Sequence, residues 1–180
     1  MPAKNSPALR PRLRRIKLLL CDVDGVLTDG SVYIGGGREV KRFNIRDGLG
    51  LVLLRRAGLK VGWVSARRSE TTRMRARELK IDFLVQQGDH LSKTGAVEKL
   101  LAEERAGWDE VCFVGDDVVD LGPLARAGLG VAVADARPQV KAAADYVTRA
   151  AGGRGAVREV VEMILRAQKK WEPIIAVYRE

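Results

Sequence analysis

The feature that most constrains this chain is an apolar run that ends abruptly in two carboxylates and a glycine. Residues 16–22 read IKLLLCD, and Asp24 and Gly25 follow after a single valine. A short apolar run bounded by a turn signal is typical of a parallel strand that is buried on both faces. Asp22 and Asp24 share one face of an extended chain, and open α/β sheets bind ligands beyond the carboxyl ends of their strands. The stretch therefore indicates an acidic site at a sheet edge, with a plain turn of solvated aspartates as the alternative.

The rest of the chain alternates strand-like and helix-like segments. Apolar runs of strand length occur at 60–64, 81–85, 110–114, 129–133 and, more briefly, 146–147; helical patterns lie at 47–57, 69–79, 93–105, 119–127 and 154–169. This alternation predicts βαβ units, and right-handed crossovers then place all strand ends on one side. We expect an α/β, Rossmann-like fold of three layers, with a central parallel sheet between layers of helices.

A second feature follows directly after the two aspartates. Two short β-type runs, at 31–34 and 40–45, flank the sequence GGGR, and runs joined by glycines predict a β-hairpin, here a flap that projects from the sheet. The segments after the first and second strands are too short to form a large cap domain. We expect a flexible basic arm over residues 1–15, one domain over 16–170 and a C-terminal tail over 171–180.

Charge and composition limit the partners. The net charge of +9 favours an anionic small molecule, and Cys21 and Cys112 lie inside predicted strands, which suits a reducing cytoplasm. No apolar stretch is long enough to span a bilayer, so we expect no membrane partner. Arginines crowd residues 67–77 and could form a nucleic-acid face, but no aromatic residues interleave with them, so we expect no nucleic-acid partner.

Polar residues follow the predicted strands, so that one sheet edge collects them. They are Asp22 and Asp24 after the first strand, Ser65 after the second, Lys93 in the loop after the third, and Asp116, Asp117 and Asp120 after the fourth. Carboxylate oxygens suit Mg²⁺, and a hydroxyl and an ammonium can hold phosphate oxygens. A carboxylate can also attack phosphorus and form an aspartyl phosphate. The set predicts phosphoryl transfer, in which positioning and charge neutralisation supply most of the catalysis.

Four short motifs occur in a recognisable order: DVDG at 22–25, Ser65, Lys93 and GDDVVD at 115–120. In these motifs the chain resembles the haloacid dehalogenase superfamily of phosphohydrolases. The resemblance implies that Asp22 is the nucleophile and Asp24 the general acid and base. It implies Mg²⁺ as cofactor, held by Asp22, Asp116 and the backbone carbonyl of Asp24, with Asp117 and Asp120 orienting metal-bound water. It also implies that Ser65 and Lys93 hold the phosphate.

Longer stretches carry a closer resemblance: DVDGVLTDG (22–30), FNIRDGLG (43–50), ADYVTR (144–149) and GGRGAVREV (152–160). They are similar to a capless subfamily that hydrolyses 3-deoxy-D-manno-octulosonate 8-phosphate (Kdo 8-phosphate) in lipopolysaccharide precursor synthesis. The resemblance implies a homotetramer in which hairpins meet centrally and the C-terminal segment, with Arg154, reaches a neighbour's active site. It implies that the substrate, a phosphorylated sugar acid, lies against Asn44, Ile45, Arg46, Asp47, Gly48, Arg67, Arg75, Lys93 and Arg154. Arginine suits the bidentate recognition of its carboxylate.

Two departures from the family pattern and two alternatives remain. The second motif reads Ser65-Ala66-Arg67 where the family more often has Thr-Gly-Arg, and the loop before Lys93 is slightly longer than usual. Arg67 favours the eight-carbon sugar acid, because a related phosphatase of a nonulosonate 9-phosphate carries Glu there. One alternative is a phosphatase of another phosphorylated sugar acid of that kind. The other is a non-catalytic domain of the same fold that serves regulation or assembly.

Overall fold

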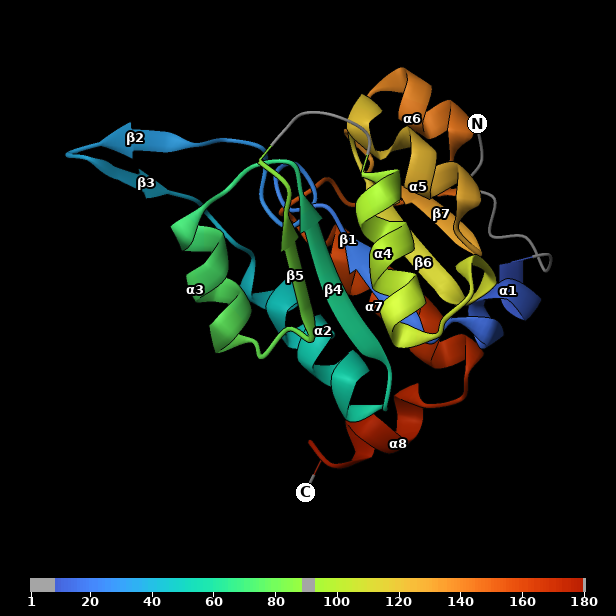
Figure 1. Ribbon diagram of the computed structural model, residues 1–180. Coiled ribbons are helices and arrows are strands. Elements are labelled where there is room, and N and C mark those ends of the chain that lie inside the picture. Colours follow the sequence, from blue (N-terminus) through green and yellow to red (C-terminus); the bar gives the residue numbers. More distant parts are fainter. Residues whose placement is uncertain (1–8, 89–92, 180) are drawn as a thin grey trace.

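The computed structural model of the protein describes residues 9–88 and 93–179 and is built on a six-stranded sheet (Figure 1). Every strand pairing in this sheet is parallel, and the strand order is β5-β4-β1-β6-β7-β8. The strands are β1 (Leu18–Cys21), β4 (Lys60–Ser65), β5 (Phe83–Gln86), β6 (Val111–Gly115), β7 (Leu129–Ala132) and β8 (Tyr146–Val147). The predicted α/β fold with a central parallel sheet is confirmed.

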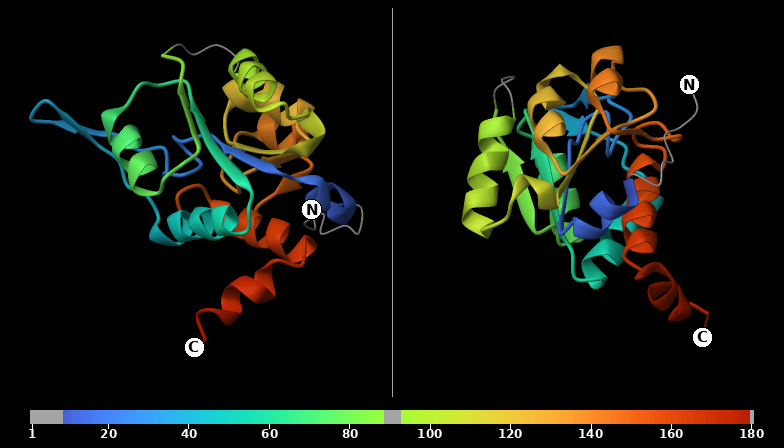
Figure 2. Two further views of the ribbon diagram at one scale, coloured as in Figure 1. Left: turned by 60° about the horizontal axis from the view of Figure 1, so that its bottom comes forward. Right: turned by 90° about the vertical axis from the view of Figure 1, so that its right-hand side faces the viewer.

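Helices cover both faces of the sheet, which makes three layers (Figure 2). Helices α2 and α7 pack against each other on one face, and α4 and α5 lie on the other. The α-helices are α1 (Leu9–Arg15), α2 (Ile45–Arg56), α3 (Glu70–Glu78), α4 (Thr94–Glu104), α5 (Leu121–Arg126), α6 (Pro138–Ala143), α7 (Ala156–Ala167) and α8 (Trp171–Ala176). Two short 3₁₀ helices, η1 (Trp108–Glu110) and η2 (Val118–Asp120), flank β6.

The apolar run of β1 forms a strand because both of its faces lie in the aliphatic core. All four residues of β1 are buried, and the strand pairs with β4 on one side and with β6 on the other. Leu20 stands opposite Gly62 of β4, and a Cβ at Gly62 would lie only 2.6 Å from Leu20 Cδ2. The central position of β1 places Asp22, at its carboxyl end, in the middle of the sheet edge.

The predicted hairpin is present as β2 (Tyr33–Gly35) and β3 (Arg38–Val40), which form a separate two-stranded antiparallel sheet. It projects from the body of the molecule at the edge where the strands of the main sheet end (Figure 1). The apolar side chains of Tyr33, Ile34 and Val40 are exposed, Ile34 by 82%. Within the described residues, the hairpin is the one insertion beside that edge, and no large cap domain is present.

Both ends of the described chain differ from the prediction. Residues 9–15, assigned to a flexible arm, instead form α1, whose Leu9 and Leu13 are buried in the core; residues 1–8 lie outside the described residues. The predicted C-terminal tail begins with α8, and its Trp171 is buried beneath the guanidinium groups of Arg158 and Arg166. Two buried leucines or one tryptophan are too weak a periodic signal, and the contacts that fix these helices come from distant parts of the chain.

Two smaller differences concern helices inside the domain. The helix predicted from residue 47 begins at Ile45, because the Asn44 side chain accepts a hydrogen bond from Arg46 N and caps it. Helix α6, with a proline in its first turn, was not predicted. No α-helix among the described residues is both long and apolar enough to cross a lipid bilayer.

Candidate active site

At the carboxyl ends of β1 and β6, a buried lysine lies between two aspartates. Lys93 Nζ lies 2.7 Å from Asp22 Oδ1 and 2.7 Å from Asp120 Oδ1. The side chains of Lys93 and Asp120 are 1% and 0% exposed, and charges buried to this degree persist only when they are paired. Lys93 stands immediately before α4, and Asp120 ends η2, so two crossovers on the same face of the sheet supply the pair. The structure thus joins Asp22 and Lys93, which the sequence analysis had placed in one site.

Asp116, directly after β6, adds a third carboxylate. One oxygen from each of Asp22, Asp116 and Asp120 lies within 4.8 Å of the others. Asp116 Oδ1 is buried and has no hydrogen-bond partner among the described residues. Gly25 leaves room for this carboxylate: a Cβ there would lie 2.2 Å from Asp116 Oδ2, and its φ of +94° favours glycine. A buried carboxylate oxygen without a donor, beside two more carboxylates, fits Mg²⁺, which prefers oxygen ligands.

The electrostatics of this group point the same way. Burial raises the pKa of Asp22, and the charge of Asp120 raises it further. Burial and the two neighbouring carboxylates likewise raise the pKa of Asp116. Burial alone would lower the pKa of the Lys93 ammonium, but the two carboxylates in contact with it outweigh burial and raise that pKa. One ammonium does not neutralise three carboxylates, so the ionised group keeps a net negative charge that a divalent cation would balance.

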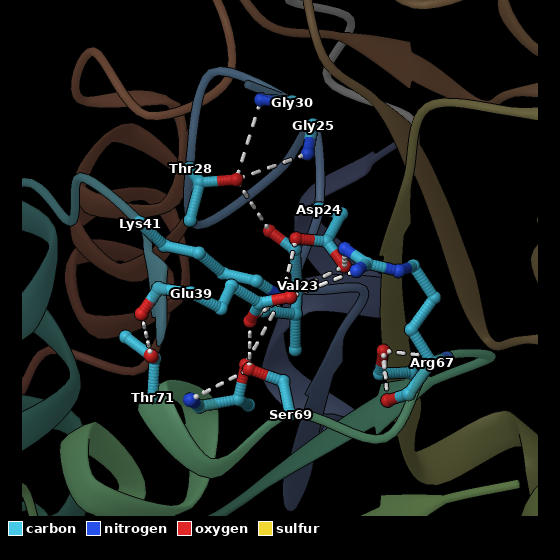
Figure 3. A network of polar contacts seen from close by, with 12 residues as sticks. Val23, Asp24, Gly25, Thr28, Gly30, Glu39, Lys41, Arg67, Ser69 and Thr71 are labelled. Atoms are coloured by element: carbon cyan, nitrogen blue, oxygen red, sulfur yellow. Dashed lines mark hydrogen bonds and ion pairs between the residues drawn. The ribbon is translucent and has the colours of Figure 1, made fainter. Parts of the chain in front are cut away.

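Asp24 contacts a lysine that the sequence analysis did not single out. Lys41 Nζ lies 2.7 Å from Asp24 Oδ1 and 3.0 Å from Asp24 Oδ2, and the Lys41 side chain is fully buried (Figure 3). Arg67 Nη1 lies 3.6 Å from the same carboxylate. The signal in the sequence was slight: Glu39 and Lys41 are two residues apart and therefore share a face of an extended segment. Nothing local indicated that this face is buried.

Ser65 and Arg67 form the turn that follows β4. Ser65 is buried, and its Oγ accepts a hydrogen bond from Arg67 N and donates one to Arg67 O, both at 3.1 Å. The Arg67 guanidinium forms an ion pair with Glu39 at 2.8 Å as well as lying near Asp24. The turn thus directs Arg67 toward the acidic edge. That Ser65 holds a phosphate stays a prediction.

Asp117 and Asp120, both predicted to orient metal-bound water, have different surroundings. Asp120 Oδ2 accepts hydrogen bonds from the backbone N of Asp116 at 3.0 Å and of Asp117 at 3.3 Å. Asp120 therefore fixes the loop that carries Asp116 while its other oxygen contacts Lys93. Asp117 is exposed, and its carboxylate accepts a hydrogen bond from Val118 N and caps η2. Asp120 lies inside the acidic group, whereas Asp117 lies at its rim.

The predicted substrate segment, residues 44–48, contacts a glycine-rich loop of the same chain. Asn44 Nδ2 donates to Gly153 O at 3.3 Å, and the Asp47 carboxylate accepts from Gly155 N at 3.1 Å and from Arg158 N at 2.7 Å. Asp47 is buried, and burial raises its pKa. Asn44 and Asp47 thus hold that loop, whereas Ile45 and Arg46, between them, are exposed.

The glycine-rich loop, residues 152–155, rests on the turn that follows Asp24. A Cβ at Gly152 would lie 1.7 Å from Gly25 O, so only glycine permits this approach. Arg154 is exposed on the loop. Arg75 packs over Gly48, where a Cβ would lie 2.6 Å from Arg75 Nη2, and forms an ion pair with Glu78 at 2.7 Å. Of the three predicted arginines, Arg67 lies beside Asp24, Arg154 stands on the loop that rests on the turn after Asp24, and Arg75 contacts Gly48 and Glu78 instead.

Comparisons with known proteins agree with this geometry. A family model described as haloacid dehalogenase-like hydrolase matches residues 84–160. The 3-deoxy-D-manno-octulosonate 8-phosphate phosphatase of Yersinia pestis is 46% identical over 163 residues, which cover 89% of this chain and 86% of the relative. The enzyme of that name from Salmonella typhimurium is 42% identical over 166 residues, 92% of this chain and 87% of the relative.

A solved structure extends the likeness to three dimensions. It is the 3-deoxy-D-manno-octulosonate 8-phosphate phosphatase of Moraxella catarrhalis in complex with a magnesium ion, a phosphate ion and KDO. It superimposes with a TM-score of 0.92 at 35% identity and covers 95% of this chain and 98% of its own. The resemblance seen in the short motifs is therefore confirmed over nearly the whole length. The chain belongs to the family of 3-deoxy-D-manno-octulosonate 8-phosphate phosphatases, phosphoric monoester hydrolases of the haloacid dehalogenase type.

Proposed function

We propose that this protein is a Mg²⁺-dependent phosphatase that hydrolyses Kdo 8-phosphate to Kdo and phosphate in the synthesis of lipopolysaccharide precursors. The observation that carries the proposal is the buried group at the sheet edge, in which Lys93 contacts Asp22 at 2.7 Å and Asp116 keeps an unpartnered oxygen. Membership of the phosphatase family is the basis for assigning Kdo 8-phosphate as the substrate. Mg²⁺ would be held by Asp22, Asp116 and the Asp24 carbonyl, and when bound it offsets the negative charge of the carboxylates and the phosphate.

The residues of the chain divide the reaction into two displacements. An Asp22 carboxylate oxygen attacks phosphorus and forms an aspartyl phosphate, while the bond between phosphorus and the sugar oxygen breaks and its electron pair goes to that oxygen. Asp24 gives its proton to the departing oxygen. Asp24 then takes a proton from a water molecule as the water oxygen attacks phosphorus, which releases phosphate and returns the electron pair to Asp22. Lys93 and Val23 N, which contact Asp22 Oδ1 at 2.7 Å and 2.6 Å, keep the nucleophile in one orientation.

Substrate recognition is assigned to groups around the acidic edge. Ser65 and Lys93 hold the phosphate, and the arginines Arg67, Arg75 and Arg154 face the sugar acid and its carboxylate. The position of Arg67, 3.6 Å from Asp24, supports this assignment because it sets a guanidinium beside the proton donor. Asn44 and Asp47 contribute by holding the loop that carries Arg154. Asp117 and Asp120 complete the surroundings of the metal.

The assembly is proposed to be a homotetramer in which hairpins of four chains meet. The exposed apolar side chains of Tyr33, Ile34 and Val40 support this, because a projecting two-stranded hairpin does not by itself bury them. We assign the protein to the cytoplasm, since Cys21 and Cys112 are free, buried thiols and the substrate is a biosynthetic intermediate.

The test is release of phosphate from Kdo 8-phosphate by the wild type, with Mg²⁺ and with EDTA, and by Asp22→Asn. We expect activity from the wild type with Mg²⁺ alone and a loss of at least about 10³-fold in the variant, because the nucleophile is absent. Asp109→Asn, which changes an exposed aspartate on η1, is the matched control and should retain full activity. Turnover of a nonulosonate 9-phosphate in preference to Kdo 8-phosphate would contradict the assignment of the substrate. If the protein hydrolyses neither ester, the result would favour a non-catalytic domain.

A further inference from the structure

Lys41 is a fully buried lysine whose role the reaction described above does not include. Its ammonium donates a hydrogen bond to Asp24 Oδ2 at 3.0 Å and forms an ion pair at 2.7 Å with Asp24 Oδ1, an oxygen without a hydrogen-bond partner among the described residues. The side chain of Lys41 is 0% exposed. The side chain of Asp24 remains 20% exposed. Lys41 therefore reaches Asp24 from the protein side, and a substrate that touches Asp24 does not touch Lys41.

The surroundings of Lys41 link Asp24 to the hairpin and to α3. Lys41 Nζ donates to Thr72 Oγ1 at 3.3 Å and lies 3.7 Å from Glu39 Oε1. Glu39 in turn accepts from Arg67 Nη2 and from the Ser69 hydroxyl, and these contacts outweigh burial and lower its pKa (Figure 3). Two cations and two carboxylates thus form one closed, internally balanced network.

Other contacts hold the backbone next to Asp24 and do not reach its side chain. Thr28 Oγ1 accepts from Gly25 N at 3.4 Å and from Gly30 N at 3.2 Å, which fixes the turn around Asp24. Apart from Lys41, the cation nearest to the Asp24 carboxylate among the described residues is Arg67, whose Nη1 lies at 3.6 Å, beyond a normal hydrogen bond. Lys41 is therefore the group that sets the orientation of this carboxylate.

We propose that Lys41 is a positioning residue that aims the Asp24 carboxylate at the departing oxygen and, later, at the attacking water. The proposal rests on the proposed function of Asp24 as general acid and base. Asp24 loses and regains a proton in each cycle, and Thr72 and Glu39 supply the ammonium with partners in both states. Aryl phosphates lack the sugar acid that Arg67 faces, so with them the effect of Lys41 should pass through Asp24 and depend on how much the leaving group needs a proton.

The test compares Lys41→Met with the wild type, in saturating Mg²⁺, on aryl phosphates from p-nitrophenyl to phenyl phosphate. Phenolate release in the first turnover reports the step in which the leaving oxygen departs. Because general acid catalysis contributes 10²–10⁴-fold, we expect Lys41→Met to lose about 10- to 100-fold on phenyl phosphate. We expect a loss under about threefold on p-nitrophenyl phosphate, whose leaving group departs without a proton. The variant should then show a burst of nitrophenolate before a slow steady state, because hydrolysis of the aspartyl phosphate also uses Asp24.

Arg42→Met is the matched control, since Arg42 is the next residue and forms an exposed ion pair with Asp29. It should leave rates on all esters unchanged. The burst amplitude measures the concentration of folded active sites. Misfolding of part of the protein would therefore lower the amplitude but would not change how the rate depends on the leaving group. If Lys41→Met does not fold, Thr72→Val, which removes one acceptor of Lys41, should show the same trend more weakly.

Equal losses on all esters, or no loss, in the variant that folds would overturn the role of Lys41. The comparison does not depend on Kdo 8-phosphate, because aryl phosphates alone reveal the trend. Failure of the wild type to hydrolyse Kdo 8-phosphate would therefore contradict the proposed function and leave the result for Lys41 intact.

Discussion

Among single residues, the three carboxylates around Lys93 lower the stability of the folded protein when they are ionised without a cation. Asp22, Asp116 and Asp120 crowd one ammonium, and the proposed reaction uses Asp22 as nucleophile and Asp22 and Asp116 as metal ligands. The raised pKa values of Asp22 and Asp116 express the cost of keeping these groups ionised without a cation. The same residues should therefore make the stability of the folded protein depend on both pH and Mg²⁺.

In the absence of Mg²⁺, we expect stability to fall as the pH rises from about 5 to 8. Asp22, Asp116 and Asp47 all have raised pKa values in the folded protein. Over this range the folded state keeps protons that the unfolded chain has released, so each step up in pH favours unfolding. The lowered pKa values of Glu39 and other carboxylates act only below about pH 4.5. The midpoint of thermal unfolding at pH 6 and pH 8, in EDTA and in Mg²⁺, measures the effect.

Mg²⁺ should stabilise the protein more at pH 8 than at pH 6, because it competes with those protons for the carboxylates. Asp116→Asn removes one buried charge and should flatten the decline in EDTA and reduce the stabilisation by Mg²⁺. Asp109→Asn, far from the site, should follow the wild type. A midpoint that rises with pH in EDTA would show that the carboxylates are already ionised and balanced without metal.

Among the elements, α2 and α7 are joined by one buried carboxylate. Asp47 in the first turn of α2 accepts hydrogen bonds from Gly155 N and Arg158 N at the start of α7. A carboxylate there satisfies backbone N–H groups that α7 cannot pair internally and interacts favourably with the helix dipole. The contact also fixes the glycine-rich loop against Gly25, so the packing of two helices is connected to the turn that carries Asp24.

Asp47→Ala should lower the free energy of unfolding by about 1–3 kcal/mol, because buried backbone donors lose their acceptor. Urea denaturation at pH 7 measures this change. The control is Glu98→Ala, which removes an exposed ion pair with Arg126 and should cost less than about 0.5–1 kcal/mol. A variant as stable as the wild type but with a raised KM for Kdo 8-phosphate would instead show that Asp47 contacts the substrate directly.

For the whole molecule, the hairpin is the element whose apolar side chains a single chain leaves exposed. Its exposed apolar residues project from the carboxyl edge of the sheet, and Lys41, directly after β3, contacts Asp24. The body of the protein buries its own core and does not need the hairpin for that purpose. Assembly through the hairpin would place subunit contacts close to the active edge of each chain.

Ile34→Glu should convert the proposed tetramer to smaller species, because it places a charge on a side chain that is 82% exposed in the single chain and that the proposed assembly would bury. Light scattering after size-exclusion chromatography measures the mass. Met74→Glu, at an exposed apolar position on α3, is the control and should keep the wild-type mass. A wild type that is monomeric at all concentrations would contradict the proposed assembly.

The amino-acid sequence by itself determined the parallel sheet, the hairpin and the sheet edge where the acidic residues meet. These follow from local signals: the apolar runs of β1 and β6 end in Asp22 and Asp116, and parallel strands place their carboxyl ends together. Asp22, Lys93 and Asp116 could therefore be assigned to one site although they lie far apart along the chain.

Only the tertiary structure decided which charged residues are buried and what they contact. Lys41 belongs to no motif of the sequence, yet it reaches Asp24. The resemblance placed Asp47 beside the substrate, whereas its carboxylate contacts the backbone at the start of α7, 108 and 111 residues further along the chain. Helices α1 and α8 likewise exist because Leu9, Leu13 and Trp171 meet the core. A charge is buried only where distant segments supply its partners, and the local periodicity of the sequence does not indicate these partners.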